Sequence, residues 1–164
     1  MTLGSSYKLD DNGRELRYGG WNLSLVSAPT AFLGGTANAR GDEAGTSDPL
    51  TLFTVTGVVA VTIFGVCTVD LVSAGAGTLS VGTTINTAGL IALTTATAID
   101  ADEIWIDATP DSSAELTSSI PEKVITTNII ESVATADITA GNIYYVCSWF
   151  PLTPTSKLTS NYPV

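Results

Sequence analysis

The stretch LTLFTVTGVVAVTIFGVCTVDLV, residues 50–72, decides the fold of this chain. Its side chains alternate with a period of two, which is typical of β-strands that have one face on a hydrophobic core. We therefore predict strands whose inward positions are the odd ones. These positions hold Phe53, Val55, Val59, Val61, Ile63, Cys67, Val69 and Leu71.

The even positions of the same stretch are only partly polar. Four threonines and Asp70 occupy some of them. Others are apolar, which predicts that the second face is also covered in part, by another sheet, a neighbouring subunit or a partner. The apolar even positions are Leu52, Val58, Ala60, Phe64 and Val66.

Two glycines divide this stretch. Gly57 lies between two runs rich in threonine and valine, so we predict a hairpin turn there. Gly65 lies inside the second run and predicts a bulge or a bend, because glycine inside a strand often marks such a site.

The composition of the whole chain favours a single all-β domain. The chain has 164 residues, enough for one domain with a core of its own. Only 13% of its residues are charged, about half the usual share, whereas threonine and valine, which favour strands, are abundant. Turn-forming residues recur about every eight to twelve residues, so we predict an antiparallel β-sandwich, jelly-roll-like in type.

The pattern divides the chain into three parts. Residues 1–49 predict an extended N-terminal arm with one or two short strands, 50–150 the sandwich, and 151–164 a proline-rich C-terminal tail. Aromatic side chains in an uncovered arm are costly in water, so we expect them to dock, for example on a neighbouring subunit. The candidate partner-binding residues of the arm are Tyr7, Arg14, Arg17, Tyr18, Trp21 and Phe32.

The arm also contains Arg40-Gly41-Asp42, the tripeptide found in some adhesion ligands. Three residues recur often by chance, and the surrounding run ANARGDEAGTSDP is generic loop sequence. We therefore interpret the tripeptide as part of a solvent-exposed loop.

Charge excludes several classes of function. The chain carries a net charge of −10 with six basic residues, sixteen acidic ones and no histidine. This balance argues against a nucleic-acid-binding surface and against attraction to an anionic membrane, and no apolar run is long enough for a membrane-spanning helix. Without histidine the commonest general base is missing. Neither a Gly-x-Ser-x-Gly nucleophile elbow nor a phosphate-binding loop occurs, so we predict that the protein is not an enzyme and binds no cofactor.

One acidic run stands out, and three interpretations of it remain open. Paired carboxylates can catalyse glycoside hydrolysis, and oxygen-rich loops can bind Ca²⁺. Alternatively, the carboxylates solvate a loop and cap a helical turn, which we favour because the spacing fits no known calcium loop. The run comprises Asp100, Asp102, Glu103, Asp107 and Asp111.

Cys67 and Cys147 both lie in predicted strands at inward positions. A disulfide requires their Cα atoms to lie within about 7 Å of each other. The opening MTLGSSYKLDDNGRELR has no apolar segment typical of a secretory signal, so we expect synthesis in a reducing cytoplasm and two free, buried thiols.

Residues 50–112 resemble small virion proteins encoded among the head genes of tailed phages. The resemblance lies in LFTVTGVVAVTIFGVCTVDL and in TLSVGTTINTAGLIALTTATAIDADEIWIDATP. Those proteins look like capsid decoration, or cement, proteins. The resemblance implies a β-rich fold, homo-oligomers that are often trimers, and an arm that contacts the major capsid protein. It also implies assembly in the host cytoplasm and a final location on the capsid exterior.

The alternative is a tail-fibre or surface module that binds glycans. Trp105, Tyr144, Tyr145 and Trp149 are the candidates for a carbohydrate-stacking platform, with Trp105 or Trp149 at its centre. At strand positions such residues are more often part of the core, which is the interpretation we favour.

Overall fold

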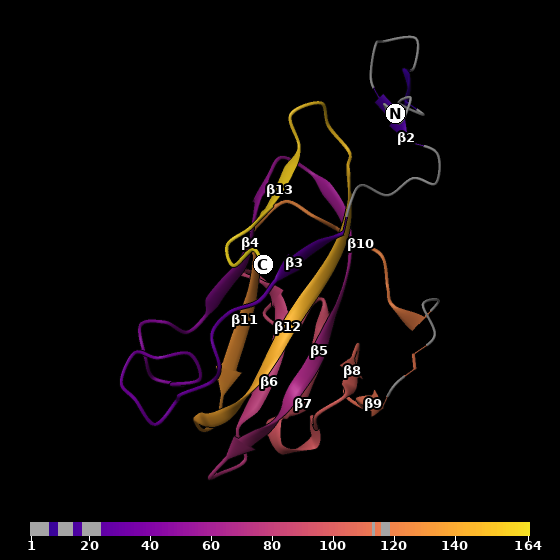
Figure 1. The fold of residues 1–164 in the computed structure, drawn as a ribbon. Helices are drawn as coiled ribbons and strands as arrows, with labels where there is room; N and C mark the ends of the chain where they lie inside the picture. Colours follow the sequence, from indigo (N-terminus) through magenta and orange to yellow (C-terminus); the bar gives the residue numbers. More distant parts are fainter. Residues whose placement is uncertain (1–6, 10–14, 18–23, 113, 116–118) are drawn as a thin grey trace.

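The computed structural model describes residues 7–9, 15–17, 24–112, 114–115 and 119–164, with the side chains of 7–9, 15–17 and 112 left out. This part of the chain forms two large antiparallel sheets packed face to face (Figure 1). The antiparallel β-sandwich predicted from the sequence is therefore confirmed, whereas its jelly-roll-like type stays a prediction. In the described residues, no helix is long and apolar enough to cross a membrane.

The first large sheet, sheet I, is built around the two longest strands, β5 and β12, which pair over most of their lengths. Strand β10 (Lys123–Ile125) pairs with the start of β5 beside this main path. The order along the path is β3 (Leu25–Ser27), β12 (Ile138–Pro151), β5 (Val59–Ser73), β8 (Glu103–Trp105) and β9 (Asp111–Ser112).

The second large sheet, sheet II, covers the inner face of sheet I. A short 3₁₀ turn, η1 (Ala96–Ala98), follows strand β7 (Ile91–Thr95) of this sheet. Strands β1 (Tyr7–Leu9) and β2 (Glu15–Arg17) pair with each other in a separate small sheet. The order in sheet II is β13 (Lys157–Ser160), β4 (Leu50–Thr56), β11 (Ile129–Ala134), β6 (Thr78–Thr83) and β7 (Ile91–Thr95).

The predicted period of two is confirmed along β5, where side chains alternate between buried and partly exposed from Val61 to Cys67. The facing strand β12 alternates in the same way from Ile143 to Cys147. Val69 departs from the pattern and is exposed, because the pairing of β5 with β12 shifts register near this residue. The buried side chains of both sheets form one hydrophobic core between them.

Both glycine predictions need correction. The chain does turn at Gly57, which has a φ of +72°, but β4 and β5 belong to different sheets, so the turn carries the chain from sheet II to sheet I instead of closing a hairpin. Gly65 forms no bulge, because its pairing is regular on both sides. A Cβ atom there would lie 3.2 Å from the Trp105 ring and 3.4 Å from the Tyr145 ring, so glycine makes room for these rings.

The predicted boundaries at residues 49 and 150 are also wrong. β3 pairs with β12, and the following segment places Phe32 and Arg40 in the interior. At the other end β13 pairs with β4, and Leu158 reaches the core. The sandwich thus extends from about residue 24 to the C-terminal strand. Strands of three or four residues are too short for a periodic pattern to reveal, and pairing with a long partner strand decides their place.

Candidate functional site

A buried ionic cluster joins the two sheets. The guanidinium of Arg40 donates to Glu131 through Nε at 2.8 Å and Nη2 at 2.6 Å, and the Tyr145 hydroxyl donates to the same carboxylate. Glu131 lies on β11 in sheet II and Tyr145 on β12 in sheet I. The bidentate pair therefore fixes the segment that carries Arg40 against both sheets.

The surroundings of this cluster satisfy the remaining donors of Arg40. Nη1 donates to the carbonyl of Thr30 at 2.7 Å, and Nη2 also donates to the carbonyl of Ile143 at 3.3 Å. The guanidinium stacks on Phe32, with Cζ 3.9 Å from the ring centroid. A buried charge is tolerated only when it is paired and hydrogen-bonded, and this charge is both.

Burial and pairing set the pKa values in the cluster. Burial acts to lower the pKa of Arg40, but attraction and hydrogen bonding to Glu131 outweigh it, so the pKa is raised. The pKa of Tyr145 is raised well above its ordinary value, first by burial and then by the Glu131 carboxylate. Arg40 is thus a permanent cation and Tyr145 a neutral donor, which suits a structural role.

The segment that carries Arg40 is an ordered loop, residues 33–48, closed by a series of turns. Backbone N–H groups at 36, 39, 42, 45 and 48 each donate to the carbonyl three residues earlier. The Asn38 side chain accepts from both the N–H and the hydroxyl of Thr46, at 3.0 Å each. The interpretation of Arg40-Gly41-Asp42 as solvent-exposed is wrong for Arg40, which is 6% exposed and paired.

Asp48 ends this loop and carries a perturbed carboxyl group. Its Oδ1 accepts from the N–H of Val133 at 2.8 Å. Burial, together with repulsion from Glu131 and other nearby carboxylates, raises its pKa to about 6 despite that hydrogen bond. Its ionisation therefore costs more than that of an exposed aspartate, although the charged form still predominates at pH 7.

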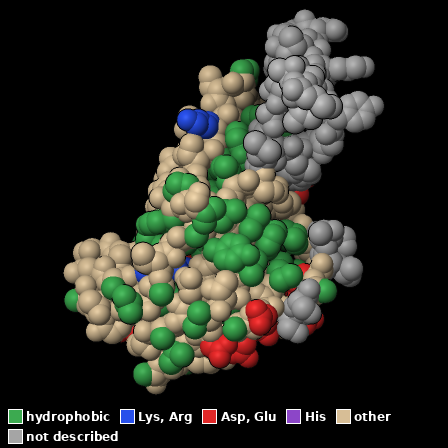
Figure 2. Space-filling view, viewed as in Figure 1, with side chains coloured by type: hydrophobic (Ala, Val, Ile, Leu, Met, Phe, Trp, Pro, Cys, Tyr) green, Lys and Arg blue, Asp and Glu red, His purple; other side chains and the backbone are tan. Residues whose placement is uncertain are grey.

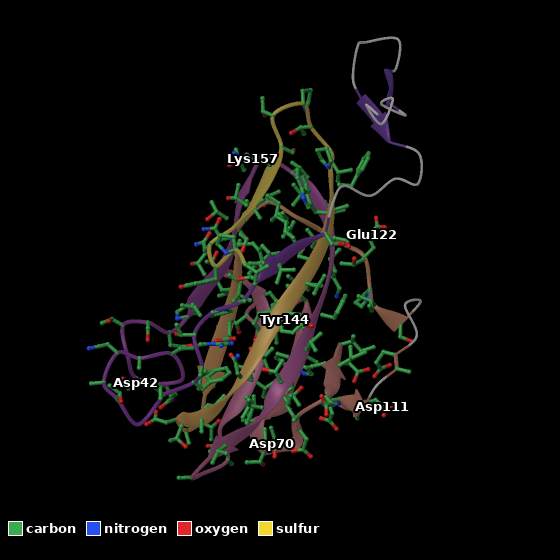
Figure 3. The ribbon with its side chains drawn as sticks, viewed as in Figure 1. Asp42, Asp70, Asp111, Glu122, Tyr144 and Lys157 are labelled. Atoms are coloured by element: carbon green, nitrogen blue, oxygen red, sulfur yellow. The ribbon has the colours of Figure 1, made fainter. Side chains whose placement is uncertain are left out.

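The outer face of sheet I, which points away from sheet II, is rich in apolar side chains. Register places Phe64 beside Val146, and Val66 beside both Tyr144 and Ile104. In the centre of Figure 2, hydrophobic side chains gather over this sheet, and Figure 3 labels Tyr144 there. By register a charged side chain, Asp111 on β9, lies beside Ile104 at the edge of this face. By register its members are Val26, Ala60, Thr62, Phe64, Val66, Ile104, Val124, Tyr144, Val146, Ser148 and Phe150.

The outer face of sheet II is built differently. Register pairs Thr54 with Thr159, Ser80 with Ser132, and Thr78 with Thr95. Small hydroxyl-bearing side chains predominate on this face, but only part of it is open to water. Thr54 and Thr95 are exposed, whereas Ser80 is 2% exposed and the Ser132 Oγ is buried without a hydrogen-bond partner. The outer face of sheet I is apolar and only partly exposed, and its covering by a neighbouring subunit or a partner stays a prediction.

The proposed aromatic platform is not formed. Trp105 and Tyr145 are both 0% exposed, and their ring centroids lie 6.4 Å apart in the core. The Trp105 indole N–H donates to the Thr94 hydroxyl at 2.9 Å, which satisfies it without a ligand. Tyr144 lies on the outer face of sheet I, whereas Trp149 packs against the core. Glycan stacking on Trp105 is excluded because the ring is not accessible.

The acidic run 100–111 uses its carboxylates to shape loops. Glu103 accepts from the N–H of Asp100 at 2.8 Å, and Asp107 accepts from both the N–H and the hydroxyl of Thr109 at 2.7 Å. Asp70, which the sequence does not place in this run, accepts from the N–H of Ala101 at 2.7 Å. Among the described residues, no three acidic, cysteine or histidine side chains are grouped to hold a metal ion.

Both cysteines are free and buried, as predicted. Burial raises the pKa of the Cys67 thiol to about 11 and raises that of Cys147 further. Both thiols are therefore protonated at neutral pH and poor nucleophiles.

The candidate partner-binding residues fall into three groups. Phe32 is 1% exposed beneath the Arg40 guanidinium, so its prediction as a partner contact is wrong. Tyr7 and Arg17 lie in β1 and β2, whose side chains are not described. Arg14, Tyr18 and Trp21 lie outside the described residues.

The residues that sequence reasoning missed are Arg40 and Glu131 as a pair. One signal was present: Glu131 stands between Ile129 and Val133 at an inward position of an apolar strand. A lone carboxylate at such a position needs a buried cation or donor.

The chain was also compared with known proteins, and no family model, curated protein or solved structure matches it.

Proposed function

We propose that this chain is a virion structural protein without catalytic activity, a decoration protein on the exterior of a phage head. In this role it binds the major capsid protein and stabilises the junctions between capsid subunits. We propose a phage head as the particle because residues 50–112 resemble head-associated proteins. The assembly role comes from the surface of the sandwich.

The observation that carries the assembly role is the largely apolar outer face of sheet I. Monomeric soluble proteins rarely expose a large contiguous apolar patch, and such patches mark interaction sites. Val124 on this face is 62% exposed, and Phe64, Tyr144, Val146 and Phe150 are partly exposed. A protein built to be covered on one face fits an accessory shell subunit better than an independent enzyme.

In this proposal the arm is shortened from residues 1–49 to residues 1–23, because β3 and the segment after it belong to the sandwich. The arm joins sheet I at Ser24, whose hydroxyl lies 2.7 Å from that of Ser148. Its candidate contacts to the capsid are Tyr7, Arg14, Arg17, Tyr18 and Trp21.

A truncation that starts at Ser24 tests this role. It leaves β3 intact, whereas a deletion to residue 30 removes β3 and the bond from the Ala28 N–H to the Tyr162 carbonyl. We expect the truncated protein to keep its circular dichroism spectrum and to lose binding to heads that lack the native protein. Full-length protein with Thr54→Lys, on the outer face of sheet II, is the matched control and should bind.

Two results contradict the proposal. One is full occupancy of the heads by the truncated protein, which removes the arm from the mechanism. The other is the absence of the chain from purified particles analysed by mass spectrometry, which removes the virion role itself.

A further inference from the structure

We propose that the open edge of β12 binds the end of the chain's own arm, residues 21–23, as a continuation of strand β3. This inference goes beyond the proposed function, because it concerns a contact within one molecule and depends on no property of a phage head. It assigns Trp21 to the sandwich and leaves the capsid contacts to the four candidate residues that precede it.

One edge of β12 is used over only part of its length. On this edge β3 pairs with β12, and the pairing ends at Cys147. Near the start of β12 the segment that follows β3 uses the same edge, where the Gly34 N–H donates to the Ile138 carbonyl at 2.9 Å. From Ser148 to Pro151, none of the described strands pairs with this edge. Unpaired backbone groups at a sheet edge form a template for another strand.

Burial along β12 changes at the residue where this edge becomes open. The inward side chains of Ile143, Tyr145 and Cys147 are each 0% exposed. Trp149 is the next inward residue, and it packs against the core but is only partly buried. Leu25, which lies beside Cys147 at the start of β3, is also only partly buried. The core is therefore incompletely covered at this corner, and apolar side chains of an added strand would cover it.

The sequence before β3 supplies apolar side chains at the spacing that a strand requires. In WNLSLVS, residues 21–27, Trp21, Leu23 and Leu25 occupy alternate positions with polar residues between them. A period of two puts these three side chains on one face of a strand. Leu25 is on the inward face, so the same face of a continued strand carries the other two.

The register of β3 extends at least one residue beyond its paired part. Ser24 and Ser148 occupy the next opposed positions, and their hydroxyl oxygens lie 2.7 Å apart. Two further steps of this register set residue 23 beside Trp149 and residue 21 beside Pro151. Proline has no N–H to donate and is tolerated at sheet edges, so it suits the end of the pairing.

The chain's own arm is a better occupant of this edge than a strand from another molecule. Residue 23 is bonded directly to Ser24, so pairing costs no translational freedom and proceeds at a high effective concentration. Residues 21–23 also carry no charge, so their pairing buries none beside the core.

Two substitutions at neighbouring positions test the pairing. Leu23→Asp puts a carboxylate on the inward face beside Trp149 and should lower the melting temperature by about 5 °C. Asn22→Asp adds the same charge on the outward face and should shift the melting temperature by less than about 1 °C. Equal shifts in the two variants, or no shift in either, overturn the inference.

A disulfide tests the register and shows whose arm binds. Asn22→Cys with Phe150→Cys puts two thiols at opposed outward positions, where the Cα atoms of an antiparallel pair lie within disulfide range. Cys67 and Cys147 are buried, so they should not compete. We expect mild oxidation of dilute protein to give an internally bridged monomer, seen by non-reducing electrophoresis and mass spectrometry. Asn22→Cys with Thr54→Cys, on the outer face of sheet II, is the matched control and should not bridge.

Two results of this experiment contradict the inference. A bridged dimer would show that the arm binds a second copy, and equal bridging in the control would show that the arm has no fixed register. Both experiments use the isolated protein, so failure here is distinct from failure of the virion role.

Discussion

Two regions rich in ionisable groups differ in what they do for this molecule. The cluster of Arg40, Glu131 and Tyr145 brings together residues far apart in the sequence and buries them between the sheets. The run 100–111 gathers five carboxylates within one short stretch, where Glu103 and Asp107 accept bonds from nearby loop groups. The contrast teaches that a high density of charge in a sequence marks a solvated loop, whereas a single buried charge marks a site on which stability depends.

Removal of the Arg40 side chain should give the largest effect. Arg40→Ala leaves Glu131 buried without its cation, and loss of one member of a buried ion pair costs about 3–5 kcal/mol in the free energy of unfolding. Urea denaturation measures this loss.

The double variant Arg40→Met with Glu131→Leu is the control for that loss. It removes both charges and keeps apolar volume, so it should be less destabilised than Arg40→Ala alone. The single variants Arg40→Met and Glu131→Leu complete the comparison. If the double variant loses as much free energy of unfolding as these two single variants lose in sum, Arg40 and Glu131 are not coupled as the geometry requires.

Tyr145→Phe should give the next largest effect. It removes the hydroxyl that donates to Glu131 in the interior and should cost about 2 kcal/mol, because a buried hydrogen bond to a charged acceptor is lost. Tyr144→Phe, one residue earlier but on the outer face of sheet I, is the matched control and should change the unfolding free energy by less than about 0.5 kcal/mol. Equal effects in the two variants would contradict the role of the cluster.

Asp48→Asn should stabilise the protein at neutral pH. The pKa of Asp48 is raised to about 6 in the folded state, so the folded state holds a proton that the unfolded state releases between about pH 4 and 6. The stability that this group contributes is therefore present at low pH and is lost as the pH rises through 6.

Because the Asp48 carboxyl is partly exposed and screened, we expect the variant to exceed the wild type by about 1 kcal/mol at pH 7. The difference should vanish near pH 4. A difference that is independent of pH between 4 and 7 would show that the gain has another cause.

Asp107→Ala should give the smallest effect. The carboxylate closes a turn at the surface with the N–H and hydroxyl of Thr109, so its loss should cost about 0.5 kcal/mol. Neither calcium nor EDTA should shift the melting temperature of the wild type or the variant. A rise in melting temperature with calcium that disappears in Asp107→Ala would establish the calcium site that we do not favour.

Sequence reasoning succeeded where a pattern is local and long. The alternation in residues 59–67 is visible without a structure, because each side chain reports its own face. The inward positions of both cysteines follow from the same alternation. The apolar even positions of β5 lie on the outer side of sheet I, and the covering of this face stays a prediction.

The remaining features depend on partners that are distant in the chain. Gly57 looks like a hairpin turn because the runs on both sides are strands, yet each of these strands pairs with others and the two lie in different sheets. β3 is recognisable only from its pairing with β12. Arg40 looks like a loop residue, because nothing near it in the sequence reveals that its partner is Glu131.

The sequence by itself determined that this protein is an antiparallel β-sandwich, because strand periodicity and composition are properties of neighbouring residues. Only the tertiary structure decided which strands share a sheet, which outer face is left apolar and which charge is buried. These choices depend on non-local pairing and on the desolvation of each group, which become defined only when distant segments of the chain meet.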